Sequence, residues 1–356
     1  MFSNPIGIKS FEDRLHKKPM FFNPYTFGGG SVGGWVELGR TTLGSAGDTI
    51  TVSSLADKRY YMILCDGLGT GAIRGSMRSG NGSVDTGSNY AFRRSHNGAA
   101  ESTFASTSQF AATSGATADN EFWVQYGSNL SANEKLFISQ TVRQNTAGAG
   151  NAPNRTEHTG KWVNTSNPLD SITLYNDQAG SYNTNAEVVV LGWDPADTHT
   201  TNFWEELASV DVSTGTTIDT GTFTAKKYLW IQTYLDDTTS VNYGCRFNSD
   251  SGTNYSRRKS NNGGSDSTST SDTTIIPNHG FGLFPHYDNY FIINNSANEK
   301  LGIRHEVAQN TAGAGNAPSR QEAVFKWANT SSQITSFQLI NSDSVDRCII
   351  KVWGSD

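Results

Sequence analysis

Cysteine is scarce in this chain, and the few cysteines present follow no pattern. Cys65, Cys245 and Cys348 are the three cysteines among 356 residues. None has a counterpart in the duplication described below, so no disulfide framework was copied with the domain. The C-x-x-C spacing of a zinc site is also absent. Free cysteine is among the most buried residue types. We therefore expect three buried thiols, and no disulfide, metal or cofactor.

Strong net charge and long apolar runs are missing as well. Charged residues make up 17% of the chain and the formal net charge is −6, which argues against non-specific nucleic-acid binding, because that requires a basic surface. No stretch approaches the roughly 18 apolar residues of a membrane helix. Residues 9–14 carry Lys9, Glu12, Asp13 and Arg14, where a signal peptide would have an apolar core. We expect neither membrane insertion nor a signal peptide.

A helical period with capping residues is also absent, and the pattern present is that of strands. Apolar and aromatic residues amount to 35% of the chain and gather in short runs, at 60–65, 122–126, 172–175 and 228–234. Polar stretches rich in glycine, serine and asparagine separate these runs. Many short strands with polar turns are typical of a β-sandwich. About eight strands fit each copy, with large loops, which favours a jelly roll.

The chain repeats itself. The segment SANEKL at residues 131–136 recurs at 296–301, and QNTAGAGNAP at 144–153 recurs at 309–318; both offsets are 165 (296 minus 131, 309 minus 144). A period this long exceeds that of a solenoid and fits a self-contained domain. The sequence therefore predicts a tandem duplication of one domain.

The repeat sets the domain boundaries. An N-terminal arm covers 1–34, copy one covers 35–194, and copy two covers 203–356, after a short polar linker. Each copy opens with a tryptophan and closes on an apolar strand containing another. We expect the first and last strands of each copy to lie side by side. The fold class is all-β: two tandem jelly-roll-like β-sandwich domains preceded by an extended arm.

The arm has an unusual composition. It is rich in aromatic and basic residues and runs into the glycine tract at 28–34, which indicates a flexible joint. A solvated tail would carry fewer aromatics, so we favour an anchor that becomes ordered on a partner over an unstructured end. The candidate anchoring residues are Phe2, Phe11, Arg14, Lys17, Lys18, Phe21, Phe22 and Tyr25.

Two segments shared by both copies are candidates for contacts with a ligand or a neighbouring chain. Tyrosine and arginine are frequent at interface hot spots, and an Arg-x-Glu pair on a strand places both side chains on one face, where they can form a polar groove. The alternatives are arginine stems that cover the sheet and exposed ion pairs of little energetic value, the latter also for Glu134 with Lys135 and Glu299 with Lys300. The candidates are Tyr90, Arg93, Arg155 and Glu157 in copy one, and Tyr255, Arg258, Arg320 and Glu322 in copy two.

No catalytic or metal-binding constellation is recognisable. Glu134 and Glu157 are candidates for a glycosidase acid and base, but nothing in the sequence brings them to one cleft. The segment 146–153 lacks the Gly-Lys-Ser/Thr ending of a phosphate loop, so we expect a turn with positive-φ glycines that ends at a proline. The segment 85–89 offers oxygen atoms but not the pattern of a known calcium loop. We expect no enzymatic activity.

The quoted segments together resemble a known type of domain. The strings DTGSNYAFRRSHNG at 85–98, ANEKL at 132–136 and QNTAGAGNAP…KWVNTS at 144–166 resemble a repeated jelly-roll-like domain of structural proteins from tailed bacteriophages, notably marine ones. The likeness covers both copies and stops short of the arm. It implies a virion protein without enzymatic activity and supplies no catalytic or binding residues.

Two functional interpretations remain open. In the first, the chain is a virion protein, either a tail-associated fibre or spike or a head decoration. Its arm docks on portal, tail or capsid proteins, it forms a homo-oligomer, with a trimer expected, and it contacts host cell-surface glycans through repeated modules. In the second, it is a secreted carbohydrate-binding or glycan-cleaving β-sandwich.

Overall fold

The computed structural model describes residues 34–111, 119–197, 201–237, 243–275, 285–309 and 311–356, and within them every regular element is a strand. Copy one holds β1–β13 and copy two β14–β24, more than the eight per copy expected. In copy one they are β1 (Val36–Thr42), β2 (Thr49–Val52), β3 (Tyr60–Gly67), β4 (Gly75–Asn81), β5 (Ser83–Val84), β6 (Tyr90–His96), β7 (Ser102–Thr107), β8 (Phe110–Ala111), β9 (Glu121–Ser128), β10 (Lys135–Arg143), β11 (Asn154–Trp162), β12 (Ser171–Asn176) and β13 (Glu187–Trp193). In copy two they are β14 (Glu205–Val212), β15 (Thr217–Asp219), β16 (Tyr228–Asp236), β17 (Tyr243–Phe247), β18 (Tyr255–Asn261), β19 (Ser267–Asp272), β20 (His286–Ile293), β21 (Lys300–Ala308), β22 (Ser319–Trp327), β23 (Phe337–Asn341) and β24 (Arg347–Ser355).

Each copy is a sandwich of one large and one small antiparallel sheet. The large sheet of copy one has the order β1-β13-β3-β9-β10-β11-β6-β7, and that of copy two β14-β24-β16-β20-β21-β22-β18-β19. The small sheets are β2-β12-β4-β5, with β8 beside β4, and β15-β23-β17. The chain crosses repeatedly between the two sheets, which gives the jelly-roll-like arrangement. The predicted fold class, two tandem β-sandwiches, is confirmed.

The ends of each copy are adjacent, as predicted. β1 pairs with β13, and β14 pairs with β24. Both opening strands carry a register shift at the same place, between Glu37 and Gly39 in copy one and between Glu206 and Ala208 in copy two. The duplication therefore preserved a local irregularity as well as the strand order.

The sandwich interiors form two separate cores. Trp123, Phe110 and Ile172 are buried between the sheets of copy one, and Phe247 and Phe325 between those of copy two. Burying one large apolar side chain contributes roughly 1.5–3 kcal/mol. These cores hold each sandwich together.

A turn with a buried tryptophan is repeated in both copies. Asp85 accepts hydrogen bonds from the Trp162 indole at 2.7 Å and from the Asn89 amide at 2.9 Å. In copy two, Asp250 accepts hydrogen bonds from the Trp327 indole and the Asn254 amide at the same two distances. These bonds hold the pKa of both aspartates low against the opposing effect of partial burial. The segment considered for calcium thus uses its carboxylate to anchor a core tryptophan.

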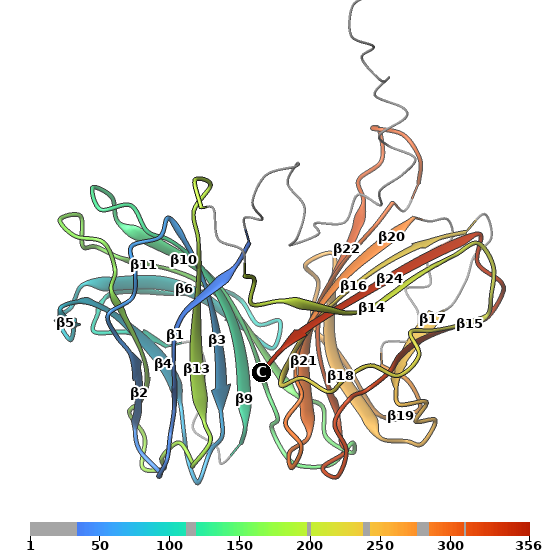
Figure 1. Cartoon of the computed structure of the whole chain (residues 1–356), viewed down its shortest axis with the longest axis horizontal. Helices are drawn as coiled ribbons and strands as arrows, with labels where there is room; N and C mark the ends of the chain where they lie inside the picture. Colours follow the sequence, from blue (N-terminus) through green and yellow to red (C-terminus); the bar gives the residue numbers. More distant parts are fainter. Residues whose placement is uncertain (1–33, 112–118, 198–200, 238–242, 276–284, 310) are drawn as a thin grey trace, which may run out of the picture.

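A third apolar core joins the two copies. It lies between the outer faces of the large sheets and includes Leu64, Phe122 and Val124 from copy one and Leu301 and Ile303 from copy two. In Figure 1, β9 and β21 lie in the middle, between the blue-to-green and the yellow-to-red sandwich. The continuous apolar run in β9 follows from this arrangement, because Trp123 faces its own core while Phe122 and Val124 face the other copy.

The two sheet faces meet at one end and separate toward the other. Val142, at the end of β10, is 0% exposed, and Ile303 in β21 is 2% exposed. Their counterparts in the other copy, Val307 and Ile138, are 44% and 61% exposed. Leu136, at the start of β10, is 55% exposed. Equivalent residues thus have opposite environments, so the contact is not two-fold symmetric.

Candidate functional site

A polar groove lies where the two copies separate. It has a volume of about 330 Å³ and is lined from copy one by β6, β10 and β11 and from copy two by β21 and β22. Its floor is formed by Gln140 and His305, equivalent residues whose side chains are hydrogen-bonded to each other. Its walls carry both signs of charge. Among its lining residues are Arg93, Glu101, Glu157, Arg320 and Glu322.

The charges of the polar groove are paired across short distances. Arg155 contacts Glu157 at 2.6 Å and also Asp266 of copy two at 2.6 Å. Arg320 contacts Glu322 at 3.2 Å. Both Arg-x-Glu segments thus form ion pairs, but the Arg155 pair is not an exposed one, because the Arg155 side chain is only 6% exposed.

Burial sets the protonation of the groove. It raises the pKa of Glu322, and the nearby carboxylate of Glu157 adds to the effect. Burial and three arginines lower the pKa of His305 to about 4. His305 is therefore neutral at neutral pH, and the groove presents carboxylates and guanidinium groups without a titrating histidine.

The structure brings four of the predicted contact residues together. Arg93, Glu157, Arg320 and Glu322 line the polar groove. Arg155 lies beneath it, and Arg258 donates to the carbonyl of Pro153 across the two copies at 2.9 Å.

The two predicted tyrosines lie elsewhere. Tyr90 and Tyr255 are 1% and 0% exposed. The Tyr90 hydroxyl donates to the carbonyl of Asp85 at 2.8 Å, and that of Tyr255 donates to the carbonyl of Asp250 at 3.1 Å. Both tyrosines serve the cores, and neither presents a surface to a ligand. The anchoring residues Phe2, Phe11, Arg14, Lys17, Lys18, Phe21, Phe22 and Tyr25 lie outside the described residues.

The interpretation of the Glu-Lys pairs as exposed ion pairs is wrong. Lys135 and Lys300 are 0% exposed and donate to backbone carbonyls. Glu134 pairs instead with Lys161 at 2.8 Å. Glu299 is buried at the contact between the copies, where it accepts a hydrogen bond from Gln144 at 2.8 Å. Each glutamate directly precedes the strand that its lysine begins, and the lysine is held by backbone carbonyls instead of by its neighbour.

The glycine-rich segments are loops, as expected. Gly148 and Gly313 have φ values of 87° and 94°, which glycine adopts without strain. β11 begins directly after Pro153, in agreement with the predicted role of the proline.

Sequence analysis missed an aromatic and aliphatic surface on copy one. Trp35, Tyr60, Tyr126 and Trp193 border a hollow of about 400 Å³ beside Leu136 and Ile138. Tyr60 and Trp193 stack at a centroid distance of 5.4 Å. The signal was present in the run at 136–138, where both alternate positions are apolar, although an outward-facing position on a half-buried strand is normally polar.

A buried ionic cluster in copy two was also missed. Arg304 is 0% exposed and contacts Asp288 at 2.5 Å, and it is also paired with Glu306. His286 contacts Glu306 at 3.0 Å. Copy one has Trp123, Ser139 and Thr141 at the equivalent strand positions, so no shared motif revealed the cluster.

The remaining expectations concern thiols, metals and membranes. All three cysteines are buried and free, as predicted, and burial raises the pKa of each thiol, to about 12 for Cys245 and Cys348. Within the described residues, no group of three or more His, Cys, Asp or Glu side chains is placed to hold a metal ion. The same residues contain no helix long and apolar enough to cross a membrane.

Comparisons with known proteins identify no family. No protein-family model matches the chain, and no curated protein sequence matches it. Among solved structures, domains LG4-5 of the mouse laminin alpha1 chain align over 93% of this chain and 86% of that chain, with 11% identity and a TM-score of 0.20. Neisserial surface protein A aligns over 82% and 99%, with 9% identity and a TM-score of 0.10. Both TM-scores are too low to support an argument about fold or function.

Proposed function

We propose that the chain is a non-enzymatic structural protein of a phage particle. In this proposal it forms part of a tail fibre or spike, or decorates the head, and residues 1–34 attach it to portal, tail or capsid proteins. One observation supports the proposal most directly: the apolar core that Phe122 and Val124 share with Leu301 and Ile303. Such a core makes the two sandwiches one stiff block, which suits a building element that projects from an attachment point.

The polar groove is the proposed contact for host cell-surface glycans. Paired arginines and carboxylates can donate and accept hydrogen bonds to sugar hydroxyls in fixed directions. Several chains in one particle would present several grooves, and such multivalency raises the overall avidity. The expected assembly is a homo-oligomer, with three chains as the working model.

Electron microscopy of intact particles from the source virus tests the proposed role. Immunogold labelling with an antibody against residues 35–356 should mark either the tail or the head surface. A chain lacking residues 1–34 should fold but no longer attach to particles. Unlabelled particles in a lysate that reacts with the antibody would refute the virion role, and attachment of the truncated chain would refute the anchoring role of the arm.

One observation favours a second candidate, a carbohydrate-active β-sandwich. Glu157 and Glu322 line the same groove, and the pKa of Glu322 is raised. Two carboxyl groups in one cleft, one of them with a raised pKa, are the arrangement of a glycosidase acid and base. Polysaccharide turnover that is lost in both Glu157→Gln and Glu322→Gln would establish this candidate in place of the first.

A further inference from the structure

The glycine-rich loop of copy one, residues 144–153, is seated on copy two. The Lys326 ammonium donates to the carbonyl of Gln144 at 3.2 Å, and the Ser256 hydroxyl donates to that of Asn151 at 2.9 Å. The Ser271 amide donates to the carbonyl of Ala149 at 2.8 Å. Further bonds run from Arg258 to Pro153 and from Gln144 to Glu299. Most of these hydrogen bonds are accepted by backbone carbonyl groups of the loop.

The loop of copy two has the same sequence but an exposed position. Residues 311–318 are all exposed. Gly313 keeps the positive φ of Gly148, 94° against 87°. The second loop therefore retains the sequence and the positive-φ glycine that the first loop uses in its contact, in an exposed position.

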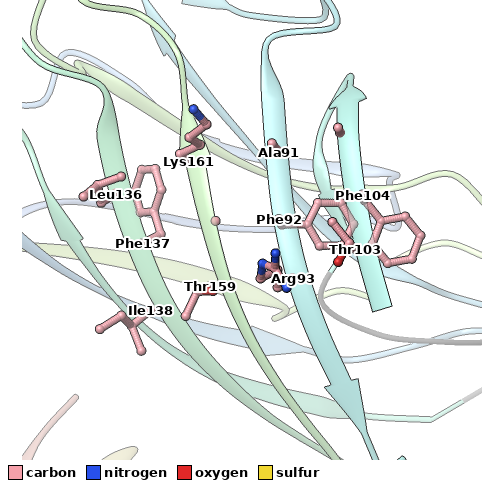
Figure 2. Close-up of a pocket in the computed structure, with 12 residues that line it drawn as sticks. Ala91, Phe92, Arg93, Thr103, Phe104, Leu136, Phe137, Ile138, Thr159 and Lys161 are labelled. Atoms are coloured by element: carbon pink, nitrogen blue, oxygen red, sulfur yellow. The ribbon is translucent and has the colours of Figure 1, made fainter. Parts of the chain in front are cut away.

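Copy one carries the matching seat as an open groove. This apolar groove has a volume of about 480 Å³, and Figure 2 shows Leu136, Ile138, Lys161 and Arg93 along it. Strand register makes these residues the counterparts of four in copy two, as Ala91 faces Lys161 in copy one and Ser256 faces Lys326 in copy two. The counterparts are Leu301, Ile303, Lys326 and Arg258. Two of the four, Lys326 and Arg258, bind the seated loop.

Most polar groups of the seat are also present in copy one. Glu134, the counterpart of Glu299, lies at the rim and pairs with Lys161. Ser106 has a φ of 51°, and its counterpart Ser271, whose amide binds the seated loop, has a φ of 54°. The groove therefore offers the donors and acceptors of the occupied seat except the Ser256 hydroxyl, because the counterpart of Ser256 is Ala91.

An ion pair across the copies gives a second complementary element. Arg155 of copy one binds Asp266 of copy two at 2.6 Å. The counterparts are Arg320, with its side chain 62% exposed, and Glu101, with its side chain 52% exposed. Copy two thus keeps a basic residue, and copy one an acidic residue, at the positions equivalent to this ion pair, although the two residues are not paired with each other within the chain.

We propose that the exposed loop residues 311–318 of one chain seat in the apolar groove on copy one of a second copy of this chain. The contact is head-to-tail, and such a contact either closes into a ring or continues as a filament. Each chain offers one loop and one groove, so two or more chains can close a ring. The inference does not depend on the proposed virion role.

The intermolecular contact should be weaker than the one within the chain. In copy two, Gln232 and Asn289 stand opposite each other where copy one has Leu64 and Val124. Gln232 is also only 2% exposed within the chain, so the sheet beside the second loop adds little apolar surface to the contact. Because less apolar surface is buried, we expect a reversible association that depends on concentration.

Sedimentation of the full chain over a wide concentration range tests the proposal. We expect association that becomes at least tenfold weaker in Ile138→Asp, which places a charge in the groove at a side chain 61% exposed. Asp343→Lys, on an exposed turn, is the control and should associate like the parent. Circular dichroism and thermal melting show whether each variant is folded.

A charge exchange identifies the contact. Arg320→Glu and Glu101→Arg should each weaken association, because like charges then face each other in every contact. A mixture of the two variants should associate again, since both contacts of a mixed pair of chains regain opposite charges.

Three results would overturn the proposal. One is a full chain that stays monomeric up to about millimolar concentration, the upper range of weak affinities. Another is association that none of these substitutions changes. The third is a monomer that begins to associate only when residues 1–33 are removed, because the arm would then occupy the groove in the intact protein.

Discussion

The buried cluster around Arg304 shows how individual residues decide stability here. One guanidinium faces two buried carboxylates, Asp288 and Glu306, inside copy two. Burial raises the pKa of Asp288, against the effect of the arginine. Taking charges out of water is expensive unless each is paired. The arginine is therefore required once the carboxylates are present, although copy one folds in the same way with Trp123, Ser139 and Thr141 at the equivalent positions.

Replacing Arg304 should be strongly destabilising. Arg304→Met leaves the two carboxylates buried without their partner, and we expect the free energy of unfolding to fall by about 3–5 kcal/mol. Arg347→Met is the matched control, since that arginine forms an exposed pair with Asp211 and should cost at most about 1 kcal/mol. Urea denaturation of both variants measures the difference. Equal losses would mean that the cluster does not contribute as described.

At the scale of the strand, β10 and β21 show one sequence pattern in two environments. Both begin with Lys-Leu and carry an isoleucine two residues after the leucine, on the same side of the strand. In β21 the outward leucine and isoleucine pack on the other copy, whereas in β10 they border the open groove. The free energy that the same side chain contributes therefore differs between the copies.

An isoleucine exchange makes this difference measurable. Ile303→Asp places a carboxylate in the core between the copies, where the Ile303 side chain is 2% exposed, and we expect a loss of about 2–5 kcal/mol together with partial separation of the sandwiches. Ile138→Asp, at 61% exposure, should change the unfolding free energy by less than about 0.5 kcal/mol. Thermal unfolding at a concentration where the chain is monomeric compares them. Equal destabilisation would contradict the one-sided contact.

The same strands show how far the sequence could predict the structure. Strand positions followed from the short apolar runs, and the adjacency of the first and last strands followed from the repeat. The different environments of Leu136 and Leu301 could not be predicted, because two identical sequence segments do not show how the two domains pack against each other. For the same reason Glu157 and Glu322 could be selected as residues but not placed in one groove. The ionic cluster escaped because it lies in one copy only, outside the shared motifs.

At the scale of the whole molecule, three histidines held neutral by burial link its stability to pH. The pKa values of His96, His158 and His305 are lowered to about 4, 3 and 4. Each takes up a proton in the unfolded chain near pH 6.5 but resists protonation in the folded one. The unfolded state therefore binds more protons between pH 6.5 and about 4, and stability is lost as the pH falls through this range. Buried carboxylates with raised pKa values, such as Asp66 and Glu121, act in the opposite direction.

Replacing His305 by the residue at the equivalent position of copy one isolates the contribution of His305 to the pH dependence of stability. His305 lies between the copies and faces Arg155, Arg304 and Arg320, so its protonation should loosen their contact. His305→Gln imports the side chain of Gln140 and removes this titration. We expect the parent to lose stability more steeply than His305→Gln between pH 6.5 and 4, with both nearly alike above pH 7, in denaturation curves recorded at each pH. Parallel curves over the whole range would show that His305 titrates normally and that acid acts through His96, His158 or the carboxylates instead.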